Sequence, residues 1–245
     1  MAHAITNYLD GSLANAPVLG ALGQPAKNIL FYDHMFNSSA SADTAQWNET
    51  IGSSTTIVHS TTVSGGIWTI TGTTGASVQM QSWAPLATIA AGRRVYIEAR
   101  VSVSSIAANT GTFFIGLQDT AGTGTSPALP CTAAGVATTS PSAIDVVGVG
   151  FAPSGAVLSI CQNGSTTATA QTLATAAAST YYRVGIYIDG RSGVTFFLDG
   201  VKVGSTITGS SIPDAALFLD MTMSNGSTAK AANVDYIWAV VEGHT

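Results

Sequence analysis

Charged side chains are scarce in this sequence. They make up 9% of its 245 residues, whereas an ordinary soluble domain carries roughly 25%. Lysine and glutamate each occur only three times. Freely diffusing monomers normally stay apart through dispersed surface charge. The composition therefore favours a component of an assembly, in which partners cover much of the surface.

Basic stripes, long apolar runs and a cysteine framework are also missing. The net charge of -5 and the pI near 5.1 argue against nucleic-acid binding. Hydrophobic residues reach 46%, yet no run approaches the roughly 18 apolar residues of a membrane-spanning helix. The first residues lack the basic and apolar regions of a secretory signal. Cys131 and Cys161 either bridge neighbouring strands or are two buried thiols acting as small apolar residues.

Catalytic and metal-binding patterns are equally hard to find. The four histidines do not show the spacing of a metal site, and no phosphate-binding loop is present. His34 beside Asp33 is either an acid–base pair or two ordinary polar residues at the end of a strand. No nucleophilic triad emerges from the sequence, and we expect no enzyme activity.

The clearest structural signal is the stretch from Tyr181 to Gly204. Apolar residues alternate with polar ones from Tyr182 to Ile188 and again from Val194 to Leu198, which is the period of a half-buried strand. Asp199-Gly200 lies between two apolar runs and predicts a tight hairpin turn. The stretch predicts three antiparallel strands.

Further strands are expected along the whole chain, with no convincing helix. They are predicted near residues 29–32, 67–71, 78–81, 94–103, 113–117, 144–151, 157–161, 217–223 and 234–241. Residues 119–142, with three prolines, are expected to form a long irregular loop. Residues 174–178 are expected to form a loop, with a short helix as the alternative. Strands without alternating helices predict an all-β antiparallel sandwich.

The first 28 residues differ from the rest, because Pro17, Gly20, Gly23 and Pro25 interrupt every helical or strand period. We expect an extended N-terminal arm over residues 1–28 and a sandwich over residues 29–245. The arm packs either on a partner or along its own domain. Its candidate anchoring residues are Tyr8, Leu9, Leu13, Val18, Leu19 and Leu22.

Several segments resemble concanavalin A-like jelly rolls of the laminin G and laminarinase type. The hairpin stretch resembles their late strands, and RVYIEARV (94–101) is similar to one of their framework strands. FYDHMF near residue 31, FFIGLQD (113–119) and VDYIWAVV (234–241) also resemble the family, in the family's order. The resemblance implies a jelly roll over most of residues 29–242.

The same family includes glucanases, whose catalytic strand carries paired carboxylates for retaining hydrolysis. This chain has no glutamate between Glu98 and Glu242, so such a pair is not expected. We expect no cofactor. The resemblance implies one alternative, a calcium ion bound by side-chain oxygen atoms of residues in turns. The candidates are Asp119, Asp189, Asp199 and Asn225, although such residues are common in turns without any metal.

The resemblance and the composition together suggest a role in a virus particle. Similar sandwiches recur in bacteriophage structural proteins, although fold alone does not fix function. We expect a capsid decoration (cement) protein on the virion exterior, bound to the major capsid protein, and a homo-oligomer, with a trimer as the expected state. The alternative is a carbohydrate-binding module of a tail fibre or adhesin, with Gln79, Gln81 and Trp83 as an open glycan-binding face. An enzyme of unrecognised type is the third possibility.

Overall fold

The computed structural model describes residues 28–33, 47–51, 55–59, 66–75, 77–108, 110–119, 144–164 and 168–242. Within these residues the chain forms sixteen strands, β1 to β16, and one short 3-10 turn, η3 (Pro153–Gly155). Residues 1–27 of the predicted arm, His34 and Cys131 lie outside the described residues. The boundary between arm and sandwich therefore stays a prediction.

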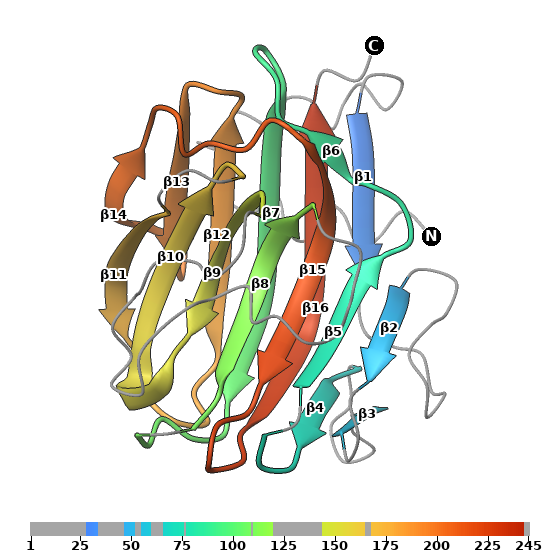
Figure 1. Ribbon diagram of the computed structural model, residues 1–245, viewed down its shortest axis with the longest axis vertical. Helices are drawn as coiled ribbons and strands as arrows, with labels where there is room; N and C mark the ends of the chain where they lie inside the picture. The colour runs from blue at the N-terminus through green and yellow to red at the C-terminus, as the bar shows by residue number, and fades with distance from the viewer. Residues whose placement is uncertain are drawn as a thin grey trace.

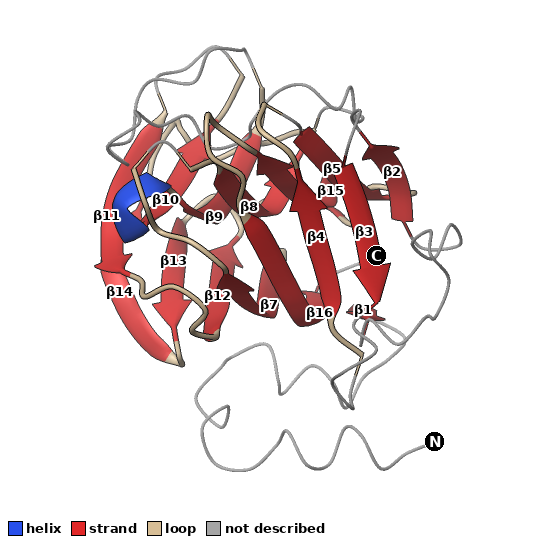
Figure 2. Ribbon diagram, turned by 90° about the horizontal axis from the view of Figure 1, so that it is seen from below, coloured by secondary structure: helices blue, strands red, loops and turns tan. Residues whose placement is uncertain are grey.

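The strands form two antiparallel sheets of eight strands each, stacked as two layers (Figures 1 and 2). This confirms the all-β sandwich that the sequence predicts. We call the layer nearer the viewer in Figure 1 the front sheet and the other the back sheet. Both sheets bury one face against the other and turn the opposite face outward.

The front sheet has the order β11-β10-β9-β8-β15-β5-β2, and β6 also pairs with β15. Its strands are β2 (Trp47–Ile51), β5 (Ser77–Ser82), β6 (Ala87–Thr88), β8 (Thr112–Gln118), β9 (Val146–Phe151), β10 (Ala156–Gln162), β11 (Thr169–Thr175) and β15 (Ala216–Ser224).

The back sheet has the order β14-β13-β12-β7-β16-β4-β3. β1 also pairs with β16, through residues 237–242, whereas β4 pairs with residues 231–234. Its strands are β1 (Asn28–Asp33), β3 (Thr55–His59), β4 (Trp68–Gly72), β7 (Arg94–Val103), β12 (Tyr182–Asp189), β13 (Gly193–Leu198), β14 (Val201–Ile207) and β16 (Ala231–Glu242).

The core lies between the sheets, and period-two alternation decides which residues enter it. On β7 the inward residues are those predicted from the sequence: Val95, Ile97, Ala99, Val101 and Val103. Their neighbours along the strand point outward, as in any pleated strand. Alternation therefore defines both outer faces as well as the core.

The hairpin predicted at Asp199-Gly200 joins β13 to β14. Both turn residues adopt positive φ, 52° for Asp199 and 82° for Gly200. Asp199 also accepts a hydrogen bond from the Arg183 backbone N–H through Oδ1, at 2.8 Å. Glycine and aspartate tolerate this conformation better than most residues, so the local sequence fixes the turn.

The edge strands β11 and β14 lie on the same side of the sandwich, where a single side chain joins the two sheets. The Gln171 side chain donates from Nε2 to the Ser205 carbonyl oxygen at 3.1 Å. Its Oε1 accepts from the Ser205 backbone N–H at 2.8 Å. Gln171 thus satisfies both the backbone N–H and the backbone carbonyl group of Ser205 on the edge of β14.

Candidate functional site

The outer face of the front sheet contains the residues predicted as a glycan face. Gln79 and Gln81 alternate with the core residues Val78 and Met80, so they point outward as expected. The face is not open at these positions, because Gln79 is 4% and Gln81 is 2% exposed. Trp83, just after β5, is 57% exposed. The structure thus corrects the expected openness for the two glutamines and leaves the glycan site itself a prediction.

Asp220 on β15, the strand next to β5, also points to this face and is fully buried. Its Oδ1 accepts a hydrogen bond from Gln79 Nε2 at 2.7 Å, and its Oδ2 accepts one from the Thr222 hydroxyl at 2.6 Å. Burial raises the pKa of the Asp220 carboxyl to about 7, because desolvation outweighs the two hydrogen bonds, which lower it. Asp220 is therefore a carboxyl group that changes charge near neutral pH.

The other half of the same face is apolar. The Phe114 ring lies over two glycines on neighbouring strands, since a methyl group on Gly148 would come within 2.3 Å of that ring. Gly116 is the register partner of both Gly148 and Asp220. The polar and apolar halves therefore meet at Gly116. The apolar cluster comprises Phe114, Ile144, Val146, Ala152, Leu158 and Ile160.

The outer face of the back sheet contains a cluster of aromatic residues. Tyr96, Tyr236, Trp238 and Val240 form a buried group, against which Tyr187 and Phe197 pack. The Tyr96 and Trp238 ring centroids are 5.1 Å apart. Trp238 is thus a buried residue of a cluster on the outer face, separate from the core between the two sheets.

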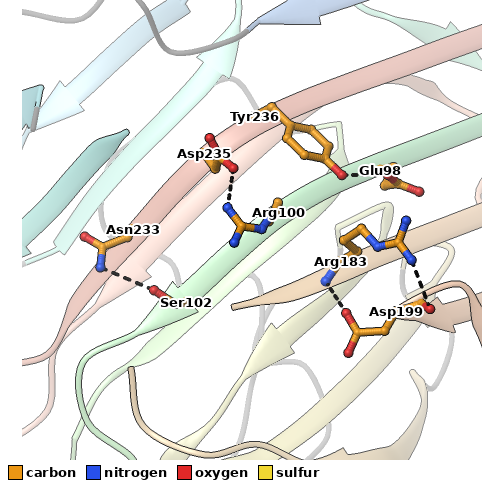
Figure 3. A network of polar contacts seen from close by, with 8 residues as sticks. All are labelled: Glu98, Arg100, Ser102, Arg183, Asp199, Asn233, Asp235 and Tyr236. Atoms are coloured by element: carbon orange, nitrogen blue, oxygen red, sulfur yellow. Dashed lines mark hydrogen bonds and ion pairs between the residues drawn. The ribbon is translucent and has the colours of Figure 1, made fainter. Parts of the chain in front are cut away.

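A buried carboxylate lies within this aromatic cluster. Glu98 accepts hydrogen bonds from the Tyr236 hydroxyl at 2.8 Å and the Tyr96 hydroxyl at 3.0 Å; Figure 3 shows the first of these. Burial and the nearby Glu98 charge raise the pKa of the Tyr96 hydroxyl, so Tyr96 stays a hydrogen-bond donor. Gly185 leaves room for this contact, since a methyl group there would lie 2.9 Å from the Tyr96 hydroxyl oxygen.

Two arginines stand side by side next to this cluster (Figure 3). Arg100 on β7 and Arg183 on β12 are register partners. Arg100 forms an ion pair with Asp235 and lies 4.2 Å above the Tyr181 ring centroid. Arg183 donates to the Asp199 carbonyl oxygen at 3.2 Å. Each guanidinium is thus drawn toward an acceptor on its own side, which separates two like charges.

The two most deeply buried carboxyl groups among the described residues, those of Glu98 and Asp220, do not form a hydrolytic pair. Glu98 and Asp220 project from the outer faces of opposite sheets. Asp145, near the start of β9, accepts a hydrogen bond from the Gly164 backbone N–H at 2.8 Å. Retaining hydrolysis needs two carboxyl groups about 5–5.5 Å apart across one glycosidic bond. The described face residues are arranged for hydrogen bonding and packing.

The four predicted calcium ligands, Asp119, Asp189, Asp199 and Asn225, all make contacts within the protein. Asp189 pairs with Arg94, and Asp199 stabilises its own hairpin. The Asn225 side chain donates to the Gly72 carbonyl oxygen and accepts from the Lys230 backbone N–H. Among the described residues, no group of three or more His, Cys, Asp or Glu side chains could hold a metal ion.

Cys161 is a free, buried thiol. It donates to the Ser211 carbonyl oxygen at 3.2 Å. Burial raises the pKa of this thiol to about 12. Of the two alternatives for the cysteines, Cys161 therefore fits the one in which a buried thiol acts as a small apolar residue.

Comparison with known proteins identifies the fold. No family model matches the sequence, and no curated protein matches it. A Bacillus licheniformis beta-glucanase superposes with a TM-score of 0.57 at 15% identity, covering 86% of this chain and 97% of that one. The Emp47p carbohydrate recognition domain gives 0.57 at 10% identity, covering 90% and 99%.

A third similar structure comes from bacteriophage phi24B. It is described as the conserved carbohydrate esterase vb_24B_21 and gives a TM-score of 0.55 at 18% identity, covering 87% of this chain and 98% of that one. No helix among the described residues is long and apolar enough to cross a membrane. At these identities the similarity establishes the fold, and this chain is a concanavalin A-like jelly roll.

Proposed function

We propose that this chain is a non-enzymatic structural protein of a bacteriophage-like virion, acting as a decoration (cement) protein on the capsid exterior. One observation carries the proposal. The buried carboxylates on both outer faces, Glu98 and Asp220, are enclosed by hydrogen bonds from neighbouring side chains. Because these hydrogen bonds come from neighbouring side chains of the same chain, we interpret the two carboxyl groups as parts of packed outer faces. The low charge of the whole chain supports a surface that partners cover.

A decoration protein stabilises a shell by binding the assembled form in preference to its free subunits. The stabilisation then follows mass action and grows with the logarithm of the free protein concentration over Kd. The proposed partner is the major capsid protein, and the proposed anchors are the apolar residues of the arm. A homo-oligomer, expected as a trimer, would place several arms on neighbouring subunits.

Deleting residues 2–26 tests the arm. The truncated chain should fold, because the first described strand, β1, begins at Asn28. It should bind phage shells at least about tenfold more weakly, because each fully buried leucine contributes about 1.5–3 kcal/mol. The measurement is co-sedimentation with shells that lack this protein, together with light scattering of the free chain.

A matched control replaces Leu9, Leu13 and Leu22 by serine in the full-length chain, which keeps the arm's length and removes its apolar contacts. Truncated or serine-substituted protein that binds shells as tightly as the natural chain would show that the arm is not the anchor. A truncated chain that does not fold would place the arm in the sandwich core.

Exposed Trp83 favours a second candidate, a carbohydrate-binding module of a tail fibre or adhesin. An exposed tryptophan beside an amide-rich sheet face offers a ring for stacking on a sugar. Trp83→Ala should then weaken glycan binding at least about tenfold, equivalent to about 1.4 kcal/mol. Val201→Ala is the matched control, because Val201 is a similarly exposed apolar residue on β14 of the other sheet. Absence of glycan binding by the natural protein on a broad array would rule this candidate out.

A further inference from the structure

Asp220 adds a buried side-chain contact between two neighbouring strands, β5 and β15. β5 pairs with β15 through residues 77–81 and 220–224, and the Gln79 side chain on β5 adds a 2.7 Å hydrogen bond to Asp220 on β15. Thr222 donates to the other carboxyl oxygen from β15 itself. The carboxyl group is thus part of the contact between β5 and β15.

The surroundings of this carboxyl group are polar but lack a compensating positive charge in the described part of the chain. The side chains that face outward around it are Gln79 and Gln81 on β5, Phe114 and Gln118 on β8, and Phe218 and Thr222 on β15. None of these six ionises, and among the described residues no neighbouring charge contributes to the shift of the Asp220 pKa. A buried carboxylate without a positive partner is costly to ionise.

We propose that the proton on Asp220 controls the contact between β5 and β15, which is closed while Asp220 is protonated and loosens as it ionises. Loosening admits water to the carboxylate and relieves its desolvation. The contact between β5 and β15 thereby weakens as the pH rises toward neutrality.

The sign and size of the effect follow from linkage. The closed state has an Asp220 pKa of about 7, and an open, hydrated state has the ordinary aspartate pKa of about 3.9. The closed state is thus fully favoured below about pH 4, and its advantage is lost between about pH 4 and pH 7. The opening equilibrium constant should rise about tenfold per pH unit in this window, about 10³-fold in total, and level off above pH 7.

Hydrogen exchange of the full-length protein between pH 4 and pH 9 tests the proposal. After correction for the intrinsic base catalysis of exchange, the exchange rate of the peptide covering β5 should rise between about pH 4 and pH 7 and then level off. The peptide covering β12 and β13 in the back sheet is the internal control and should show neither. Asp220→Asn keeps an acceptor for Gln79 but cannot ionise, so its corrected exchange should be independent of pH.

A second variant keeps the test decisive if Asp220→Asn does not fold. Gln79→Met removes a donor that lowers the Asp220 pKa, so this pKa should be higher in the variant. The corrected exchange rate of β5 should then keep rising above pH 7 before it reaches its plateau. Corrected exchange of β5 that does not change with pH in the natural protein would overturn the proposal. The same pH dependence in Asp220→Asn as in the natural protein would also overturn it.

Discussion

Replacing Glu98 by leucine is expected to lower the free energy of unfolding by about 3 kcal/mol. The substitution removes the acceptor of two buried hydroxyls, those of Tyr96 and Tyr236. A buried donor that loses its acceptor costs about 1–3 kcal/mol, and the desolvation cost of the carboxylate, which the substitution removes, offsets part of the total. Chemical denaturation at pH 7 measures the change.

The tyrosines supply the control for this prediction. Adding Tyr96→Phe and Tyr236→Phe to Glu98→Leu removes the donors together with the acceptor, so most of the lost stability should return. Glu98→Gln, which keeps one acceptor oxygen, should cost only about 1 kcal/mol. If the triple variant is less stable than Glu98→Leu alone, the hydroxyl–carboxylate bonds are not the source of the effect.

Replacing Gly116 by alanine is expected to destabilise the protein by about 3 kcal/mol. The added methyl group would lie 2.3 Å from the Val147 carbonyl oxygen and 2.6 Å from the Gly148 Cα. Both atoms belong to the backbone of the adjacent strand β9, which cannot move without disturbing its hydrogen bonds to β8. Overpacking of this kind typically costs about 1–3 kcal/mol, and a rigid backbone places Gly116 at the upper end.

Gly75→Ala separates crowding from backbone strain. Gly75 has a φ of +72° and no atom within 4 Å of the methyl position, so its substitution should cost only about 1–2 kcal/mol, the penalty of the left-handed conformation. Thermal unfolding of both variants ranks the two effects. Equal losses would mean that the front sheet accommodates the methyl group on Gly116 by a small shift of β9.

Strands with strong alternation could be predicted from the sequence because each contributes one face to the core. β7 has the predicted bounds, Arg94–Val103, and β12 and β13 alternate as expected. β2, β3 and β11 were not predicted. β11, TAQTLAT, is at an edge and only half buried, so threonine and alanine dominate it and the hydrophobic period is weak.

The polar contacts of the outer faces could not be predicted, because they join residues far apart in the chain. Gln79 and Asp220 are 141 residues apart, and Glu98 and Tyr236 are 138 apart. Alternation placed Gln79 and Gln81 on the outward face, but it carries no information about what lies over that face. A lone aspartate between apolar residues on a strand was the available signal for a buried carboxyl.

The side chain of Gln171 has a consequence for how this protein can meet other molecules. A strand added to β14 from another chain would need the N–H and C=O groups along that edge, and Gln171 already occupies those of Ser205. The positive φ of Gly204, +66°, further distorts the same edge, and Lys202 adds a charge to it. Irregular, charged edges resist strand addition. The edge of β14 is therefore poorly suited to pairing with a strand of another chain, which is the contact that would extend the back sheet from one molecule to the next.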